Sequence, residues 1–282
     1  MSVNCNSPAT PVNHEKDNIQ PVVALPHDLN ECSGMIEVGK NTFIGINDGG
    51  YKPILFVFTD DKKVETRMVK VSGVENNDWE ELADDEDYLY IGDFGNNAGN
   101  RRNLMIYKIR KDDVLKLSEV KPEIIHFGYE PQITFKKSNQ NNFDCEAMTC
   151  IGDSIFLFTK NRGNLNTDLY GVPKIPGSYV AKKMASYKAL GLITGADYMK
   201  MDYLGELILV GYNMHKGSYD PFLIYFTNIT GRDFFGGESK RMVLDRKLQM
   251  ESVFFHNGHE VYMANEEQKD EQGFIYKAIK PE

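Results

Sequence analysis

DWEELA at residues 78–83 and YLYIGD at residues 88–93 form the clearest copy of a unit that recurs along this chain. In each copy a hexamer precedes a short turn, and an apolar strand follows the turn. Internal repetition of this kind is a signature of repeat architectures. The other hexamers are ECSGMI at 31, DCEAMT at 144, TGADYM at 194 and QMESVF at 249, and the strands after them are TFIGIN at 42, SIFLFTK at 154, ELILVGY at 206 and EVYMAN at 260.

A third strand completes each unit, and a looser fourth strand such as VETRMVKV at 64 or ESKRMVL at 238 follows the first four units. The segments are short, rich in β-branched and aromatic residues, and broken by Gly or Asn, which favours strands over helices. Four short strands in about 40–60 residues are typical of one propeller blade. The sequence therefore predicts an all-β fold, a five-bladed β-propeller.

The two ends of the chain suggest how this ring closes. Only 31 residues follow Glu251, which is enough for three strands but not for four. IQPVVALP at 19–26 is a candidate for the missing outer strand, since an N-terminal strand that completes the last blade leaves no free edge. A six-bladed ring is the alternative, with the extra blade inside residues 108–142. The predicted organisation is a disordered tail at 1–18 and a single propeller domain at 19–282.

Composition limits the class of protein and its partners. The chain has 282 residues, of which 41% are hydrophobic and 26% are charged, and its net charge is −9. These values are ordinary for a soluble globular protein, and no apolar run approaches the roughly 18 residues that a membrane helix needs. The negative charge disfavours nucleic acid as a partner and fits cations better. We expect a monomer without a membrane span.

The N-terminal residues bear on the location of the protein. They contain no basic stretch followed by an apolar segment, so no signal peptide is visible. Two locations stay open: the cytoplasm, or the periplasm or extracellular space for a mature form without its leader. Cys5 would be the lipid acceptor of an anchored form. Cys32, Cys145 and Cys150 lie in strand-like stretches without metal-ligand spacing and are predicted to be buried thiols.

Alignment of the five units places one residue of each at the start of an innermost strand, next to the central axis. Three glutamates near one narrow axis would repel one another and raise their pKa values unless a cation neutralises them. Carboxylate oxygens suit Ca²⁺, and the lack of His and Cys in the column disfavours zinc and copper. In the structural alternative, the carboxylates cap backbone amides or pair with Lys160, Arg162 or Arg101. The predicted metal ligands are Ser33, Glu80, Glu146, Ala196 and Glu251.

The residues that end the second strands of the units form an outer column, which lies on the same face of the ring as the starts of the innermost strands. Polar loops follow these residues. Gly and Asn in these loops favour hairpin turns, whereas the charged residues also suit a ligand mouth. The basic members would hold a phosphate or carboxylate, and Asp48 and Asp93 would position water or metal. The residues predicted to line this mouth are Asn47, Asp93, Lys160, Tyr212 and Asn265, together with Asp48, Arg101, Arg102, Asn161, Arg162 and Asn213.

Over nearly its whole length the sequence resembles uncharacterised, mostly exported bacterial propellers that carry NECSG…NDGG and NDWEELA…YLYIGDFGNNAGNRRNLMIYKI. This resemblance implies the propeller fold and export, but no activity. More distantly, the blade pattern is similar to the calcium-activated nucleotidase (apyrase) family, five-bladed propellers that hydrolyse nucleoside di- and triphosphates. In that family a central Ca²⁺ lies among Ser and Glu residues that open successive inner strands. Ser33, Glu80, Glu146 and Glu251 match these positions, and Ala196 stands where the family has Ser.

The nucleotidase resemblance extends to CEAMTCIGDSIFLFTKNRGNLNTDLY, which carries Lys160 and Arg162 at the family's basic pair. Asn47 and Asp48 fall on the family's pair of acids after the first unit's second strand. The sequence thus predicts a Ca²⁺-binding propeller whose axial mouth binds a phosphorylated or otherwise anionic small molecule. If the protein is a hydrolase, Asp48, Asp93, Lys160 and Arg162 are its predicted catalytic residues. The alternative is a non-catalytic propeller that recognises a glycan or a protein at the same mouth.

Overall fold

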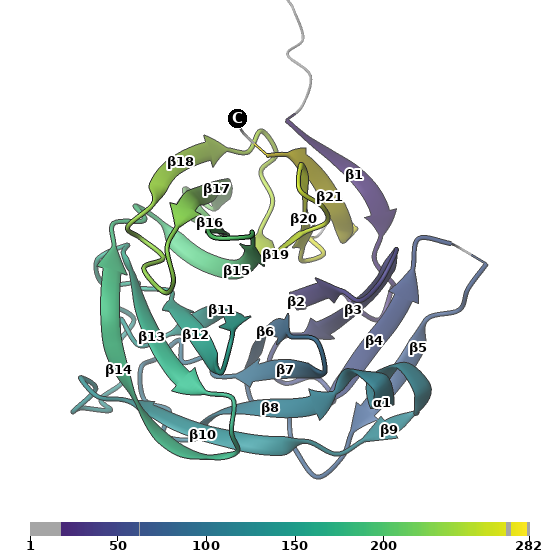
Figure 1. Ribbon diagram of the computed structural model, residues 1–282, viewed down its shortest axis with the longest axis horizontal. Helices are drawn as coiled ribbons and strands as arrows, with labels where there is room; N and C mark the ends of the chain where they lie inside the picture. Colours follow the sequence, from purple (N-terminus) through teal and green to yellow (C-terminus); the bar gives the residue numbers. More distant parts are fainter. Residues whose placement is uncertain (1–17, 62, 269–271, 281–282) are drawn as a thin grey trace, which may run out of the picture.

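The computed structural model describes residues 18–61, 63–268 and 272–280, and its strands form sheets arranged radially around a central axis (Figure 1). Along the chain, the first complete sheet has the order β2-β3-β4-β5-β9. Its strands are β2 (Cys32–Glu37), β3 (Thr42–Asn47), β4 (Ile54–Thr59), β5 (Arg67–Val71) and β9 (Glu119–Val120).

An eight-stranded sheet follows, and it consists of two antiparallel runs. The runs join where β10 and β14 pair in parallel, with Ile125 opposite Gly177. The first run is β6 (Trp79–Asp84), β7 (Tyr88–Asp93), β8 (Leu104–Arg110) and β10 (Glu123–Tyr129). The second run is β11 (Cys145–Ile151), β12 (Ser154–Thr159), β13 (Thr167–Pro173) and β14 (Gly177–Tyr187).

Two four-stranded sheets complete the ring. One contains β15 (Leu192–Lys200), β16 (Gly205–His215), β17 (Ser218–Ile229) and β18 (Glu238–Val243). The other contains β19 (Met250–Phe255), β20 (Glu260–Asn265), β21 (Phe274–Ile279) and β1 (Ile19–Ala24).

The innermost strands follow one another around the axis. β2 contacts β6, β6 contacts β11, β11 contacts β15, β15 contacts β19, and β19 contacts β2. Buried apolar side chains such as Ile44, Val69 and Leu89 pack together between neighbouring sheets. The described residues form one α-helix, α1 (Lys111–Lys116), directly after β8. The fold is therefore an all-β propeller, as the repeat predicts.

The N-terminal strand β1 is the outer strand of the last sheet, which confirms the predicted closure. It pairs antiparallel with β21, with Ile19 opposite Ala278, and the Ile19 side chain is fully buried. Immediately before β1, Asn18 Nδ2 donates to the carbonyl of Val243 at 2.7 Å. Residues 1–17 lie outside the described residues.

Residues 108–142 add strands to existing sheets. β9 pairs with β5, and β10 lies between β8 and β14. The strands in this described stretch are the end of β8, β9 and β10. Both strand-like pieces of the stretch thus extend sheets that other units begin.

The register between the first and second strand of each unit shifts at the same point, which indicates a β-bulge in each innermost strand. A bulge leaves one residue unpaired and re-aims its side chain. In the fourth unit this residue is Thr194 and not the predicted Ala196, because β15 begins at Leu192, two residues before the predicted hexamer, and Ala196 pairs with Leu209. The bulged residues are Ser33, Glu80, Glu146, Thr194 and Glu251.

The predicted loop after Tyr212 is an extended hairpin in the structure. β16 and β17 stay paired as far as His215 opposite Ser218. Lys216 and Gly217 form the turn, with φ angles of 52° and 81°. Two successive residues with positive φ are typical of the tight turn that matches strand twist, so the strands continue past the predicted end.

The three described cysteines lie in strands, as the sequence predicts. Cys32 and Cys145 are buried, Cys150 is partly buried, and all three are free thiols. Cys5 lies outside the described residues. Within the described part of the chain, no helix is both long enough and apolar enough to cross a membrane.

Candidate functional site

The bulges gather polar side chains at one end of the propeller axis, which we call the axial mouth. Two bulged hydroxyl groups tie adjacent innermost strands together: Ser33 Oγ donates to the carbonyl of Trp79 at 2.8 Å, and Thr194 Oγ1 donates to that of Met250 at 2.7 Å. The axial mouth comprises these bulged residues, the carboxylates Glu31, Asp48, Asp78, Asp144 and Glu266, the bases Lys160 and Arg162, and Tyr212.

Strand register divides the predicted outer column into two sets of residues. One set accepts hydrogen bonds from backbone amides and braces the adjacent loops. The residues after Asn47, Thr159 and Asn265 point to the opposite side, as in any extended segment, and face the mouth, whereas Phe94, after Asp93, is buried in an apolar cluster. The amides of Glu31, Asp78, Asp168 and Phe274 donate to side-chain oxygens of Asn47, Asp93, Thr159 and Asn265, at 2.8–3.2 Å. The mouth-facing residues are Asp48, Lys160, Tyr212 and Glu266.

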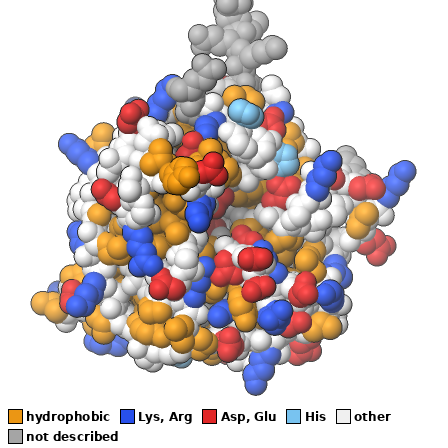
Figure 2. Space-filling model, viewed as in Figure 1, with side chains coloured by type: hydrophobic (Ala, Val, Ile, Leu, Met, Phe, Trp, Pro, Cys, Tyr) orange, Lys and Arg blue, Asp and Glu red, His pale blue; other side chains and the backbone are white. Residues whose placement is uncertain are grey.

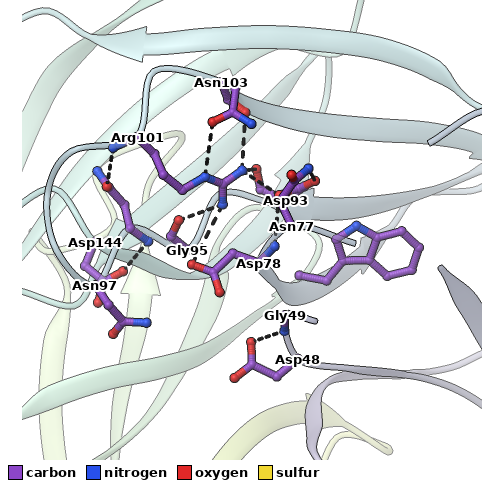
Figure 3. A network of polar contacts seen from close by, with 12 residues as sticks. Asp48, Gly49, Asn77, Asp78, Asp93, Gly95, Asn97, Arg101, Asn103 and Asp144 are labelled. Atoms are coloured by element: carbon purple, nitrogen blue, oxygen red, sulfur yellow. Dashed lines mark hydrogen bonds and ion pairs between the residues drawn. The ribbon is translucent and has the colours of Figure 1, made fainter. Parts of the chain in front are cut away.

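Asp48, Asp78 and Glu80 place carboxylate oxygens within 4.8 Å of one another. Two glycines leave the space for them. A Cβ on Gly95 would lie 2.1 Å from Glu80 Oε1 and 2.4 Å from Asp78 Oδ2, and a Cβ on Gly49 would lie 2.6 Å from Asp78 Oδ1. Figure 3 shows Asp48 and Asp78 on neighbouring segments, with both glycines close by. Among the described residues, this carboxylate triplet contains a predicted metal ligand, Glu80.

A second carboxylate triplet shares Asp48. It consists of Glu31, Asp48 and Glu266, whose oxygens also lie within 4.8 Å of one another. Glu251 is close to the same end of the axis, where its Oε1 accepts a hydrogen bond from Gln249 Nε2 at 2.6 Å. The predicted ligand Glu251 is therefore in a different local setting from Glu80.

Sequence reasoning missed four carboxylates of the axial mouth, of which Glu266 directly follows the predicted Asn265. Glu31, Asp78 and Asp144 lie two residues before the bulges of their strands. The signal was present, because these acids are the first letters of ECSGMI, DWEELA and DCEAMT. Alignment on the third letter alone left them out.

Glu146 is paired with basic side chains. Its carboxylate bonds Lys160 Nζ, and its Oε1 lies 3.5 Å from Arg162 Nη2. Arg162 Nε also donates to Asp144 Oδ2 at 3.0 Å. Burial opposes the charge on Lys160, but Glu146 and Tyr212 outweigh it and raise the pKa of Lys160 well above its usual value. This is the pairing that the structural alternative predicts for Glu146.

Burial and mutual repulsion raise the pKa of five further carboxyl groups of the mouth: Asp48, Asp78, Glu80, Glu251 and Glu266. Burial, with a contribution from Asp48, raises the pKa of Asp78 to about 7. Burial raises the pKa of both Glu251 and Glu266 to about 8. The pKa of Glu80 also lies well above its usual value, mainly through burial. These groups hold protons near neutral pH unless a cation replaces them.

Asp93 and Arg101 form a braced pair beside the mouth (Figure 3). Arg101 Nη2 donates to Asp93 Oδ1 at 2.6 Å, and Arg101 Nη1 donates to the carbonyl of Gly95 at 2.7 Å. Asp93 is fully buried, and Asn77 Nδ2 and Tyr107 OH donate to its Oδ2 at 2.9 and 3.1 Å. These contacts use the charged groups of both residues to hold the loop after β7.

The other predicted loop residues lie in varied settings. Asn161 is fully buried and its Oδ1 accepts from Thr159 Oγ1 at 2.7 Å. Asn213 lies within the β16 hairpin extension. Arg102 is exposed, and its guanidinium lies 3.5 Å from the centre of the Phe135 ring. The structure therefore does not join Arg102 to the acids of the mouth through any contact between described residues.

The donor set of the axial mouth fits a hard cation. Both triplets offer carboxylate oxygens only, without His or Cys, and Ca²⁺ takes six to eight oxygen ligands. Asp48, Asp78 and Glu80 would hold the ion, and Glu31 and Glu266 lie within reach of the shared Asp48. The space beside Gly95 supports the fit, because any larger residue there would displace two of the donors.

Comparison with known proteins supports the fold. No protein-family model matches the chain, and no curated protein matches it. It is similar to the PQQ-bound aldose sugar dehydrogenase of Streptomyces coelicolor, with a TM-score of 0.54, 8% identity, and coverage of 94% of this chain and 99% of that one. It is also similar to a Bombyx mori GH32 beta-fructofuranosidase in complex with sucrose, with a TM-score of 0.52, 9% identity, and coverage of 91% of this chain and 61% of that one. At such low identity these likenesses show the propeller fold alone.

Proposed function

We propose that this chain is a Ca²⁺-binding propeller whose axial mouth binds a phosphorylated or otherwise anionic small molecule. The observation that carries the proposal is the triplet of Asp48, Asp78 and Glu80, which brings three carboxylates together in a largely buried setting. Such a group destabilises the fold through repulsion and becomes favourable around a cation. Burial and mutual repulsion also raise the pKa values of these acids.

The bases of the mouth support the second part of the proposal. Lys160 and Arg162 lie beside Glu146 and Asp144, on the same face as the carboxylate triplet. Ca²⁺, when bound, would supply positive charge for a phosphate oxygen. Lys160 and Arg162 would then orient the anion through charge-assisted hydrogen bonds. In a hydrolytic version, Asp48 would orient the attacking water, and Asp93 would act only through the brace that it forms with Arg101.

The finer description of the molecule follows the repeat. We count five blades, one for each repeated unit, with the eight-stranded sheet contributing two of them. The pairing of β10 with β14 then joins two blades at their outer edges. The resemblance to exported bacterial propellers leads us to propose an exported monomer.

The metal part of the proposal is tested by thermal unfolding with EDTA and with added Ca²⁺. We expect Ca²⁺ to raise the Tm by several degrees through preferential binding to the folded state. Asp78→Asn combined with Glu80→Gln should abolish this shift. Asp87→Asn, which changes an exposed carboxylate in the turn after β6, is the matched control and should retain the shift. A wild-type Tm that does not respond to Ca²⁺ would contradict the proposal.

The ligand is tested separately by assays with nucleotides, sugar phosphates and phosphodiesters. Hydrolysis that requires Ca²⁺ and falls in Arg162→Gln would support the enzymatic version. Binding without turnover would support a ligand-binding propeller instead. Neither binding nor turnover of any anion would contradict the anionic ligand while leaving the metal site intact.

Recognition of a glycan without catalysis is the second candidate. Pairing of Asp93 with Arg101 and of Glu146 with Lys160 engages much of the predicted catalytic set in internal contacts. One similar propeller is an aldose sugar dehydrogenase and another holds sucrose. A glycan array probed with and without Ca²⁺ would identify this function.

A further inference from the structure

A cavity of about 390 Å³ lies at the other end of the propeller axis. Its lining includes the ends of the innermost strands, whereas the axial mouth lies at their starts. Glu80 at the mouth and Asp84 in the cavity are four residues apart in β6, which is about 13 Å along an extended strand. In the view down the ring, the middle of the visible face is hollowed, with acidic and basic side chains at its edge (Figure 2). The cavity is therefore a site separate from the mouth.

Two of the carboxylates that line the cavity have basic partners. Glu37 Oε2 lies 2.7 Å from His256 Nδ1, and the Asp84 Oδ2 atom accepts from Lys111 Nζ at 2.7 Å. Asp84 thus has a charged partner, and Glu37 shares a hydrogen bond with a histidine ring.

Asp197 is the carboxylate of the cavity without a basic partner, since no ion pair or hydrogen bond joins it to a base among the described residues. The Tyr198 amide donates to Asp197 Oδ1 at 2.7 Å, and the Phe255 amide donates to Oδ2 at 2.8 Å. These bonds fix the carboxylate between β15 and β19. Each oxygen can accept at least one more hydrogen bond, so the group remains able to bind a ligand donor.

The walls of the cavity favour an organic cation over a bare metal ion. Its lining is mixed: the partly exposed residues Tyr198, Met199 and Phe255 supply carbon surface beside the polar groups. A metal ion prefers several oxygen ligands, whereas an ammonium group on an alkyl stem uses one carboxylate, aromatic faces and apolar walls together. The cavity volume is in the range of sites for small ligands.

We propose that this cavity is a second binding site, which takes a small organic ammonium ion with its charged group on Asp197 and its alkyl part against the partly exposed residues Tyr198, Met199 and Phe255. Lys200 lines the same cavity and is exposed. Its positive charge opposes binding of a cation. Removal of Lys200 should therefore strengthen binding if the ligand is positively charged and weaken it if the ligand is negatively charged.

The test is calorimetric titration of the full chain at pH 8 and low salt with n-butylammonium and with 1-butanol, which have similar shapes and differ in charge. We expect the ammonium ion to bind at one site and the alcohol to bind at least about tenfold more weakly. Equal binding of both compounds, or no ammonium binding at millimolar concentrations, would overturn the proposal.

Variants locate the site and confirm the sign. Asp197→Asn should weaken ammonium binding about tenfold or more, because it removes the charge of the carboxylate without a basic partner. Lys200→Ala should strengthen binding a few-fold, while Lys182→Ala, at an exposed lysine of β14, should leave it unchanged. Asp48→Asn should also leave it unchanged, which separates this site from the mouth. If Asp197→Asn does not fold, Lys200→Ala decides alone: unchanged or weaker ammonium binding in that variant would overturn the proposal.

Discussion

The positions of the carboxylates at the axial mouth depend on neighbouring glycines, which have no side chain. Gly49 and Gly95 leave room where the carboxylates of Asp78 and Glu80 lie. The bulge at Glu80 aims that side chain at the same place. Acids crowd together here because backbone geometry, and not attraction between them, sets their positions.

Gly95→Ala should lower the affinity for Ca²⁺. The new Cβ would lie 2.1 Å from Glu80 Oε1, so the two donor carboxylates must move apart. Changes to the residues that orient the ligands of a metal lower the affinity for the metal by roughly 10–100-fold. Calorimetric titration with Ca²⁺ measures the change. Gly128→Ala, whose Cβ meets nothing within 4 Å, should bind Ca²⁺ as the wild type does. Equal affinity of the two variants would argue against the carboxylate triplet as the site.

Lys160→Met should destabilise the protein strongly in EDTA. The Lys160 side chain is 4% exposed, and its loss leaves the buried Glu146 carboxylate without its main partner. Breaking a buried pair in this way costs about 3–5 kcal/mol of unfolding free energy, which urea denaturation measures. Lys116→Met removes an exposed pair with Asp112 and should cost less than about 1 kcal/mol. A similar loss of unfolding free energy in the two variants would show that the pair of Lys160 and Glu146 contributes little to stability.

At the scale of elements, β1 joins the beginning of the chain to its end. It covers the edge of β21, whose backbone groups would otherwise be free to pair with another chain. Its inner side chains complete the core of the last sheet, so closure depends on burial as well as on hydrogen bonds.

Ile19→Asp should destabilise the protein far more than Val22→Asp. Ile19 is 0% exposed, whereas Val22 in the same strand is 41% exposed. A charge at the buried position loses the apolar contacts and remains unpaired, at a cost of about 3 kcal/mol or more. Urea denaturation of both variants measures the difference. Equal stability would mean that β1 does not contribute to the core in solution.

At the scale of the whole molecule, the acids of the axial mouth link stability to pH and to Ca²⁺. In the folded protein the pKa is about 7 for Asp78 and about 8 for Glu251 and Glu266. In the unfolded chain these groups titrate near pH 4. Between about pH 4 and pH 8 the folded state therefore binds more protons than the unfolded state, so this contribution to stability falls as the pH rises.

We accordingly expect the free energy of unfolding in EDTA to fall between pH 5 and pH 8, and saturating Ca²⁺ to oppose the fall by neutralising the carboxylates. Urea denaturation at both pH values, with and without Ca²⁺, measures the effect. The double variant Glu251→Gln with Glu266→Gln should show a weaker pH dependence than the wild type. An identical pH slope in EDTA and in Ca²⁺ would exclude cation binding by these groups.

The strands and their order around the ring could be predicted because strand formation follows local composition and period. TFIGIN, YLYIGD and EVYMAN coincide with β3, β7 and β20 to the residue. The outer strand at residues 19–24 was predictable because a ring with a missing strand leaves an unpaired edge. The fourth unit was misaligned because β15, β16 and β17 are longer than the other strands of their kind, and a two-residue shift there moves Thr194 out of the column.

Local sequence thus determines that this chain forms repeated short strands, with acids at the starts of the inner ones. Tertiary structure alone decides which acid meets which partner. Glu80 joins Asp48 and Asp78, whereas Glu146, at the equivalent bulge, pairs with Lys160. A shift of one residue in the register of a strand moves its side chains to the opposite face. Bulges and contacts between strands that are far apart in sequence determine this register, so local sequence alone does not determine which acid meets which partner.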